Sequence, residues 1–129
     1  MIPIQINNLD HIVLTVANIE TTVEFYTNIL GMKKEVFGSN RIALKFGNQK
    51  INLHKAEKEF KPKAQNPVPG SSDLCFITNT KLDDFEIHLS KNNIHIIEGP
   101  VKRTGANGKI SSIYFRDPDK NLIEVSNYL

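Results

Sequence analysis

Four residues that could bind a divalent metal occur singly in four predicted strands. They are His11 in "LDHIVLTV", His54 in "KINLH", Asp73 in "SSDLCFIT" and Glu124 in "NLIEVS". Side chains alternate between the two faces of a strand, so each of these residues lies opposite an apolar set that suits the core. Two imidazoles with one or two carboxylates can ligate a first-row divalent metal and leave positions open for a substrate. The cation would also offset the cost of burying the carboxylates.

Each of the four residues, taken alone, has a simpler explanation. A single strand histidine is more often structural than metal-binding, and Asp73 could end a turn. Glu124 could pair with Arg41 or Arg116 at a sheet edge. The joint pattern favours a metal site, because all four residues fall at corresponding places of an apparent repeat.

Two halves with one order of elements must position these residues. We expect a strand, a helix and three strands from about residue 7 to 57, and the same order from about 70 to 128. A polar segment with three prolines, from about 58 to 69, separates them as a linker. These halves make one α+β domain over residues 1–129.

The two predicted helices have recognisable ends. Asn18 can cap the first helix, and Gly31 supplies its left-handed stop. Thr80 and Asp83 form a capping box for the second. The apolar residues of these helices fall at three- and four-residue spacing: Ile19, Val23, Tyr26, Ile29 and Leu30, then Leu82, Phe85 and Leu89.

A sequence offset that grows along the chain relates the two halves. An offset of 62 converts His11 to Asp73, and an offset of 70 converts His54 to Glu124. The extra length falls in "EGPVKRTGANGK", which reads as a loop. A two-fold relation between the halves would bring the four residues together, with His54 equivalent to Glu124. An ordinary α+β sandwich without internal symmetry is the alternative.

The composition is that of an ordinary globular protein. Of 129 residues, 40% are hydrophobic and 23% charged, and the net charge of +2 comes from scattered basic residues. This scatter argues against a nucleic-acid partner, and the absence of a long apolar run argues against a membrane partner. We see no signal peptide and expect a cytoplasmic protein. The single Cys75 cannot form an internal disulfide, and we expect a small buried side chain there.

Two motifs resemble those of a known family. The opening "LDHIVLTVANIETTVEFYTNILGMK" and the closing "YFRDPDKNLIEV" are similar to the signatures of the vicinal oxygen chelate superfamily, which includes glyoxalase I, the bleomycin- and fosfomycin-resistance proteins and extradiol dioxygenases. The segments "FGNQKINLH" and "KPKAQNPVPGSSDLCFIT" look most like the glyoxalase domain-containing protein 5 group. One departure is Lys120, where the family usually has glycine. We expect Asn121 to take the left-handed turn instead.

The resemblance implies a fold and a metal site. Its fold is two βαβββ modules whose mixed sheets form a cleft, either within one chain or across a homodimer. By position, the resemblance makes His11, His54, Asp73 and Glu124 the ligands of one divalent ion, which would be nickel, zinc, manganese or iron. A full set of four resembles the glyoxalase and epimerase branch, whereas a His, His, Glu set resembles the fosfomycin-resistance branch.

The resemblance also implies three candidate functions for a small-molecule substrate. The first is glyoxalase-like lyase or isomerase chemistry, in which Glu124 or Asp73 abstracts a proton next to a carbonyl. The second is extradiol ring cleavage, since Tyr114 stands ten residues before Glu124, although a core aromatic is the more common explanation for such a strand tyrosine. The third is a resistance-type transferase or a small-ligand-binding protein.

Basic residues could bind an anionic part of the substrate. Arg41, Arg103 and Lys109 are the candidates, with Lys102 beside them. The segment Val101 to Gly108 could act as a lid over the cleft. A solvated hairpin loop is the alternative explanation for that segment.

Overall fold

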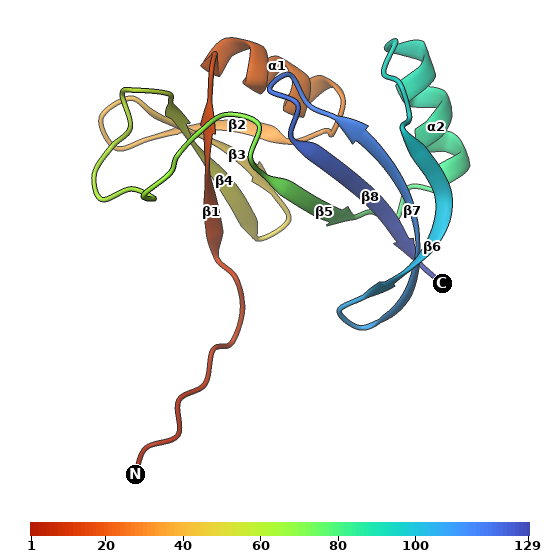
Figure 1. The fold of residues 1–129 in the computed structure, drawn as a ribbon, viewed down its shortest axis with the longest axis horizontal. Coiled ribbons are helices and arrows are strands. Elements are labelled where there is room, and N and C mark those ends of the chain that lie inside the picture. The colour runs from red at the N-terminus through yellow and green to blue at the C-terminus, as the bar shows by residue number, and fades with distance from the viewer.

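The computed structural model describes residues 1–129 as two βαβββ units in succession (Figure 1), which confirms the predicted fold class. The first unit comprises β1 (His11–Val16), α1 (Ile19–Asn28), β2 (Lys33–Phe37), β3 (Arg41–Phe46) and β4 (Gln49–Lys55). The second comprises β5 (Asp73–Ile77), α2 (Leu82–Lys91), β6 (Glu98–Gly105), β7 (Gly108–Arg116) and β8 (Leu122–Tyr128). Neither helix has the length and apolar character needed to cross a bilayer.

The two units have the same sheet topology. The strand order is β1-β4-β3-β2 in the first and β5-β8-β7-β6 in the second. In each sheet the first strand runs parallel to the last one, and the remaining pairs are antiparallel. β1 and β5 therefore occupy corresponding ends of their sheets, and each has one edge without a strand partner.

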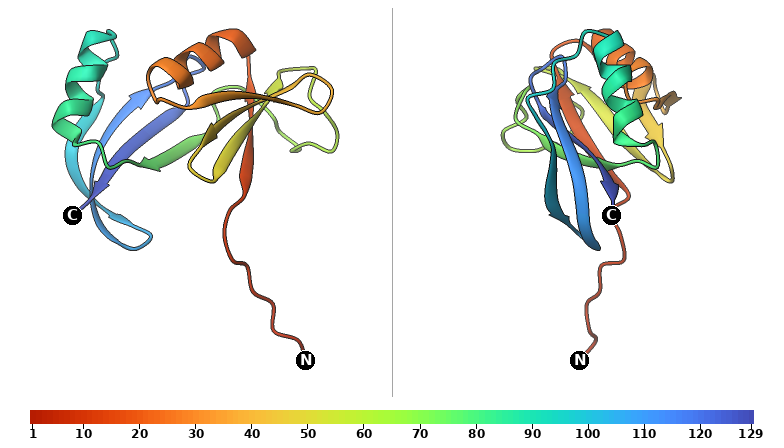
Figure 2. Two further views of the ribbon diagram at one scale, coloured as in Figure 1. Left: turned by 180° about the vertical axis from the view of Figure 1, so that it is seen from behind. Right: turned by 90° about the vertical axis from the view of Figure 1, so that its right-hand side faces the viewer.

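One hydrophobic core joins the units. It collects apolar side chains from both sheets and both helices, among them Leu14, Leu44, Leu89 and Ile123. Phe25 of α1 packs against Phe115 of β7 with ring centroids 6.4 Å apart. The helices lie next to each other (Figure 2), and His88 of α2 bonds to the carbonyl of Ile29 through Nε2 at 2.9 Å. Because the core uses one face of each strand, the opposite face of each sheet is left for polar residues.

A buried hydrogen bond between the units should contribute measurably to stability. The hydroxyl of Tyr26 donates to Oδ2 of Asp117 at 2.7 Å, and Tyr26 is fully buried. Burial and the adjacent carboxylate raise the pKa of Tyr26 far above its usual range, so it remains a donor. We expect Tyr26→Phe to lower the free energy of unfolding by about 1–3 kcal/mol, because it leaves a buried acceptor with one partner fewer.

Urea unfolding would measure this effect, and Tyr128→Phe is a matched control. The Tyr128 hydroxyl accepts from the backbone N–H of Asn107 at 3.0 Å, but on an exposed hairpin. Equal losses in the two variants would contradict the assigned role of the Tyr26 bond.

The segment expected as a lid is mostly strand. β6 begins at Glu98, and Gly105 pairs with Gly108 across a two-residue turn. The two glycines therefore serve a tight β-hairpin, which agrees with the hairpin alternative for Val101 to Gly108.

Tertiary contacts replace the capping box predicted for α2. The N-cap residue is Lys81, and no side chain of the expected box caps the helix. Instead, Oδ1 of Asn127 accepts from the backbone N–H of Leu82 at 3.0 Å. The Asn127 amide nitrogen donates to the carbonyls of Thr78 and Thr80 at 2.8 and 2.9 Å.

The turn between β7 and β8 also differs from expectation. Lys120 itself adopts the left-handed conformation, with φ of 72°. Asn121 is fully buried, and its side chain donates to Asp117 and accepts from the backbone N–H of Ser72, each at 2.8 Å. The polar asparagine side chain is therefore needed inside, and the solvent-exposed lysine takes the unfavourable backbone angle.

Candidate functional site

Hydroxyl groups surround the carboxylate of Glu124 on the polar face of the second sheet. Ser112 donates to Oε2 of Glu124 at 2.6 Å, and Ser126 lies 3.4 Å from the same oxygen. The two serine hydroxyls are 2.6 Å apart, because Ser112 and Ser126 are opposite each other in the β7–β8 pairing. Serine donors thus make the partial burial of Glu124 tolerable without any further group.

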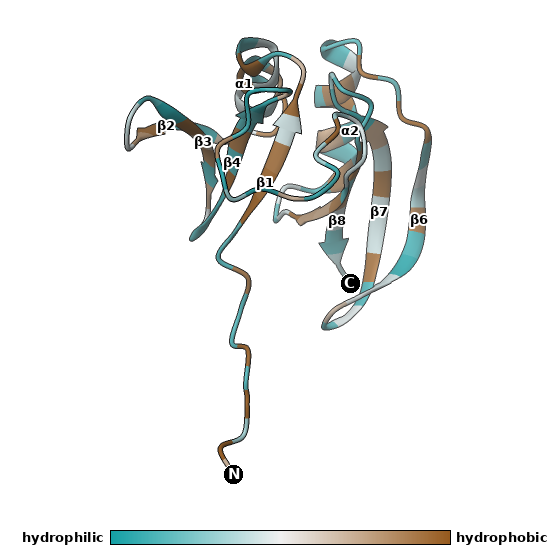
Figure 3. Ribbon diagram, turned by 60° about the vertical axis from the view of Figure 1, so that its left-hand side comes forward, coloured by the Kyte–Doolittle hydropathy of each residue, from teal (hydrophilic) through white to brown (hydrophobic).

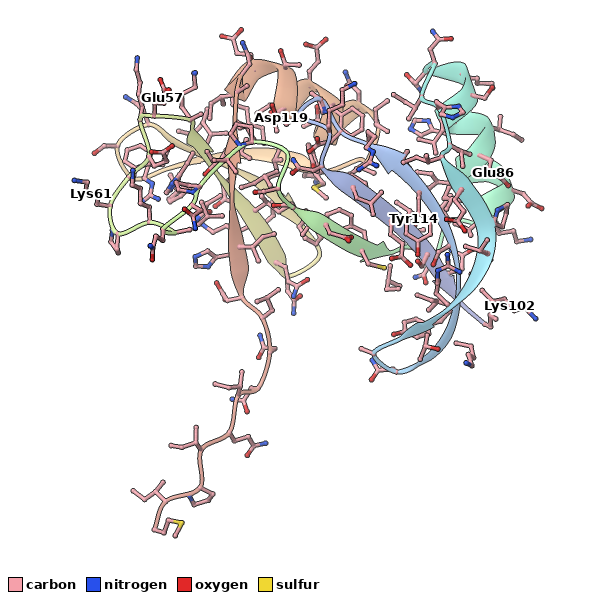
Figure 4. The ribbon with its side chains drawn as sticks, in the orientation of Figure 1. Glu57, Lys61, Glu86, Lys102, Tyr114 and Asp119 are labelled. Atoms are coloured by element: carbon pink, nitrogen blue, oxygen red, sulfur yellow. The ribbon has the colours of Figure 1, made fainter.

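Tyr114 lies beside Glu124 on the same face, because the two residues are directly paired between β7 and β8. Figure 4 labels Tyr114 among the side chains of the second sheet. Nε of Arg103 donates to the Tyr114 hydroxyl at 3.0 Å, and Nη2 of Arg103 bonds to Glu98 at 3.1 Å. Burial raises the pKa of Tyr114, although the Arg103 bond opposes this, so the phenol stays protonated. The explanation of Tyr114 as a core aromatic is therefore wrong.

The strand β5 adds Asp73 and Cys75 to this face. Asp73 is exposed, and its carboxylate makes no hydrogen bond. Cys75 is also exposed, contrary to expectation, and pairs in register with Glu124. Its Sγ lies 3.5 Å from the Ser126 hydroxyl. Partial burial and the neighbouring Glu124 raise the pKa of the Cys75 thiol.

His11 begins β1 on the polar face of the first sheet. Its Nδ1 lies 2.8 Å from a carboxylate oxygen of Asp10, and this bond lowers the pKa of Asp10. Such a carboxylate partner fixes the imidazole so that Nε2 is free, as in many metal-binding histidines. Sequence reasoning overlooked Asp10, although its place directly before His11 was visible.

Asn52 is a second residue that sequence reasoning overlooked. Its side chain is buried, at 6% exposure, and its Oδ1 has no hydrogen-bond partner. In register, Asn52 lies between Val13 of β1 and Ala43 of β3. It shares a face with Lys50, which pairs with His11, so His11 and Asn52 are diagonal neighbours. The sequence signal that could have identified Asn52 is its position as a polar residue between two apolar ones in "INL".

His54 lies away from His11 on that sheet. It pairs with Thr15, four residues beyond His11 along β1, which corresponds to about 13 Å. Nη2 of Arg41 lies 3.4 Å from Nε2 of His54. Burial, reinforced by Arg41, lowers the pKa of His54. The Arg41 guanidinium also stacks on Phe60 of the linker, 4.4 Å from the ring centroid. His54 and His11 therefore cannot share one ion within this sheet.

The strand registers correct the predicted equivalence between the halves. His11 pairs with Lys50, and Asp73 pairs with Leu122. The offset between β4 and β8 is therefore 72, which makes Asn52 equivalent to Glu124 and His54 equivalent to Ser126. The sequence prediction, with an offset of 70, was wrong by two residues. Each sheet consequently has a diagonal pair: His11 with Asn52, and Asp73 with Glu124.

The polar residues of one chain lie in three separate cavities. A cavity of about 420 Å³ between the units is lined by Asp10 and His11. A second, of about 570 Å³ under the linker, contains His54. A third, of about 450 Å³ on the second sheet, contains Asp73 and Glu124. No three side chains of His, Cys, Asp or Glu come close enough to hold one metal. A single chain therefore does not assemble the four predicted ligands.

The three basic residues predicted to bind substrate are also dispersed. Arg103 shares the cavity of Glu124, and Arg41 lies beside His54. Lys109 precedes Ile110, which pairs with Arg103, so Lys109 points to the opposite face, and its Nζ lies 3.2 Å from the hydroxyl of Thr104. Lys109 therefore lies on the opposite face of the sheet from Arg103 and Glu124.

Comparison with known proteins shows the same architecture in close relatives. Residues 8–125 match the profile of the Glyoxalase/Bleomycin resistance protein/Dioxygenase superfamily. The chain is 56% identical to virulence protein STM3117 of Salmonella typhimurium, over 96% of this chain and 86% of that protein. The structure of integron cassette protein VCH_CASS1 from the V. cholerae mobile metagenome is 60% identical and superposes with a TM-score of 0.97, over 99% of this chain and 100% of the other.

A third relative is more distant in sequence. It is the metallothiol transferase FosB of Staphylococcus epidermidis, which is 28% identical over 93% of this chain and 83% of that protein.

Proposed function

Since this chain belongs to the Glyoxalase/Bleomycin resistance protein/Dioxygenase superfamily, we propose that it is a divalent-metal-dependent enzyme that binds vicinal oxygens of a small substrate and abstracts a proton from it. This is lyase or isomerase chemistry of the glyoxalase kind. One observation carries the proposal: two diagonal pairs, His11 with Asn52 and Asp73 with Glu124, occupy equivalent positions of two sheets.

The residues of these pairs fit a divalent metal. His11 has a free Nε2 because Asp10 engages Nδ1, and Asn52 has a buried oxygen without a partner. Diagonal neighbours in a sheet lie about 7–8 Å apart, close enough for both side chains to reach one ion. One imidazole nitrogen with amide and carboxylate oxygens suits nickel, zinc, manganese or iron. We propose His11, Asn52 and Glu124 as ligands, with Asn52 in place of His54.

We propose that the complete site forms across a homodimer. The first sheet of one protomer would face the second sheet of the other, because the single chain keeps the two pairs in different cavities. Both faces carry charged side chains. Lys45 and Lys50 accompany His11 on one face, whereas Glu98, Arg103 and Arg116 accompany Asp73 and Glu124 on the other.

The side chains of the second sheet suggest a division of roles. A bound divalent metal would supply Lewis acidity toward the substrate oxygens. Glu124 is held in place by Ser112 and Ser126, whereas the Asp73 carboxylate has no hydrogen bond and is free to accept a proton. Tyr114 stays protonated and can donate. Arg103, which already bonds to Tyr114, would take an anionic group of the substrate.

The name of the staphylococcal relative supports the metal requirement. FosB, which is 28% identical to this chain, is named a metallothiol transferase.

Metal analysis and proton exchange would test the proposal. We expect apoprotein dialysed against nickel, zinc or manganese to bind about one ion per chain. The loaded protein should exchange the carbon-bound proton of a thiol adduct of a 2-oxoaldehyde in deuterated water, and Asp73→Asn should lose the exchange but retain the metal. Absence of metal binding at micromolar concentrations would contradict the proposal. Ligand binding that survives His11→Ala would instead favour a binding protein.

Ring cleavage is the second candidate, and one observation favours it. Tyr114 is directly opposite Glu124 with its hydroxyl exposed to the same cavity. Oxygen uptake with catechols under Fe(II), lost in Tyr114→Phe, would favour this alternative over proton abstraction.

A further inference from the structure

The first ten residues form an arm that extends away from the molecule (Figure 3). They contain neither helix nor strand, and the arm runs on from β1 into solvent in each view. Ile2, Ile4 and Ile6 are 85%, 88% and 84% exposed. These three alternate with Pro3, Gln5 and Asn7, as in a strand with one apolar face. Three fully exposed isoleucines in a row of this kind indicate a missing contact.

An apolar groove of about 420 Å³ lies between the two units, beside the root of the arm. Its walls include Leu30, Met32, Phe46, Phe76, Phe85 and Val125. Cys75 and Ile77 of β5 also line it, and both are exposed. β5 has one edge without a strand partner, so unpaired backbone groups are available along this wall.

We infer that the arm of one protomer lies in this groove of a second copy of the chain, with Ile2, Ile4 and Ile6 inward. Leu9 and His11 form part of the rim, so the chain's own arm starts at the groove and leaves it. Entry into its own groove would require the arm to reverse direction. A second copy accepts it without reversal, since an eight-residue extended segment spans about 26 Å.

The geometry also fits a reciprocal exchange. A two-fold axis would give each groove one arm, so the contact closes at a dimer. The extended arm can add to the free edge of β5 through backbone hydrogen bonds, while alternate side chains fill the groove. This inference concerns the dimer contact and does not depend on metal binding.

The single native cysteine allows a direct test. In separate variants, Ile2, Ile4 and Ile6 are replaced by cysteine, and Pro3, Gln5 and Asn7 serve as matched controls. Under mild oxidation with EDTA present, we expect Cys75 to cross-link to at least one even-numbered position between chains, and to none of the odd-numbered ones. The Cys75→Ser change should abolish the cross-link, which excludes bonding between two arms.

The products distinguish the possible occupants of the groove. A covalent dimer on a non-reducing gel supports the inference. An intramolecular disulfide would show that the arm folds back, and absence of any cross-link, or equal cross-linking at odd positions, would likewise overturn it. As an independent readout, Ile4→Ser should weaken the dimer about tenfold by sedimentation, whereas Gln5→Ser should not. Because metal is absent throughout, failure here leaves the proposed function untouched.

Discussion

A mixture of His11→Ala and Glu124→Ala protomers is expected to bind metal, although neither variant should bind it alone. In the proposed dimer, each site takes His11 and Asn52 from one chain and Glu124 from the other. A mixed dimer therefore has one site with all ligands intact and one site with two ligands missing. Random exchange of subunits should restore about one quarter of the sites, because half of the dimers are mixed and half of their sites are intact.

Metal content after unfolding and joint refolding would measure this recovery. The matched control mixes His11→Ala with Asn52→Ala, two changes in the same half-site, and should give no recovery. A cleft built within one chain cannot be restored by mixing. Equal metal content in the two mixtures would thus contradict the shared site.

Asn52→Asp is expected to make the stability of the protein depend on metal. Asn52 is buried and equivalent to Glu124, but no serine hydroxyl bonds to its Oδ1. An unpaired carboxylate there should lower the free energy of unfolding of the metal-free protein by about 2–4 kcal/mol. Bound divalent metal would compensate the charge, and the added anionic ligand should tighten metal binding at least about tenfold.

Thermal unfolding with EDTA and with excess metal would show both effects. His54→Ala is the control, because His54 lies about four residues from His11 along the strand and bonds to Arg41. It should change metal affinity less than threefold. If His54→Ala abolished binding and Asn52→Asp stayed insensitive to metal, the original assignment of His54 would be preferred.

Alternation of apolar and polar residues predicts the polar face of each strand, whereas the arrangement of the sheets was implied by the family resemblance. Ile51 and Leu53 had to face the core, so Asn52 and His54 had to face away from it. The same logic placed Glu124 between Ile123 and Val125. These predictions succeed because burial of apolar side chains leaves little choice of face.

The register between β1 and β4 could not be predicted in this way. A shift of two residues keeps every side chain on its face, so the pattern cannot distinguish Asn52 from His54 as the neighbour of His11. Histidine is the more common metal ligand and therefore the stronger prediction, but the pairing of His11 with Lys50 places Asn52, and not His54, next to His11. Only long-range backbone pairing carries this information.

Contacts between distant segments account for the other differences. The cap of α2 comes from Asn127, which is 45 residues away from Leu82. The glycines of the expected lid serve a hairpin whose partner strand is set by the sheet. Local sequence could not reveal either partner.

The three hydrogen bonds of Asn127 fix the position of β8 along its own axis. Asn127 lies on the face opposite Glu124 and three residues further along, so one side chain anchors the strand while the other is displayed. A shift of β8 along its axis in either direction would break the Asn127 hydrogen bonds as it moved Glu124 away from Ser112. The bond from the first residue of α2 to Asn127 therefore sets the register of β8, and with it the position of the Glu124 carboxylate on the opposite face of the sheet.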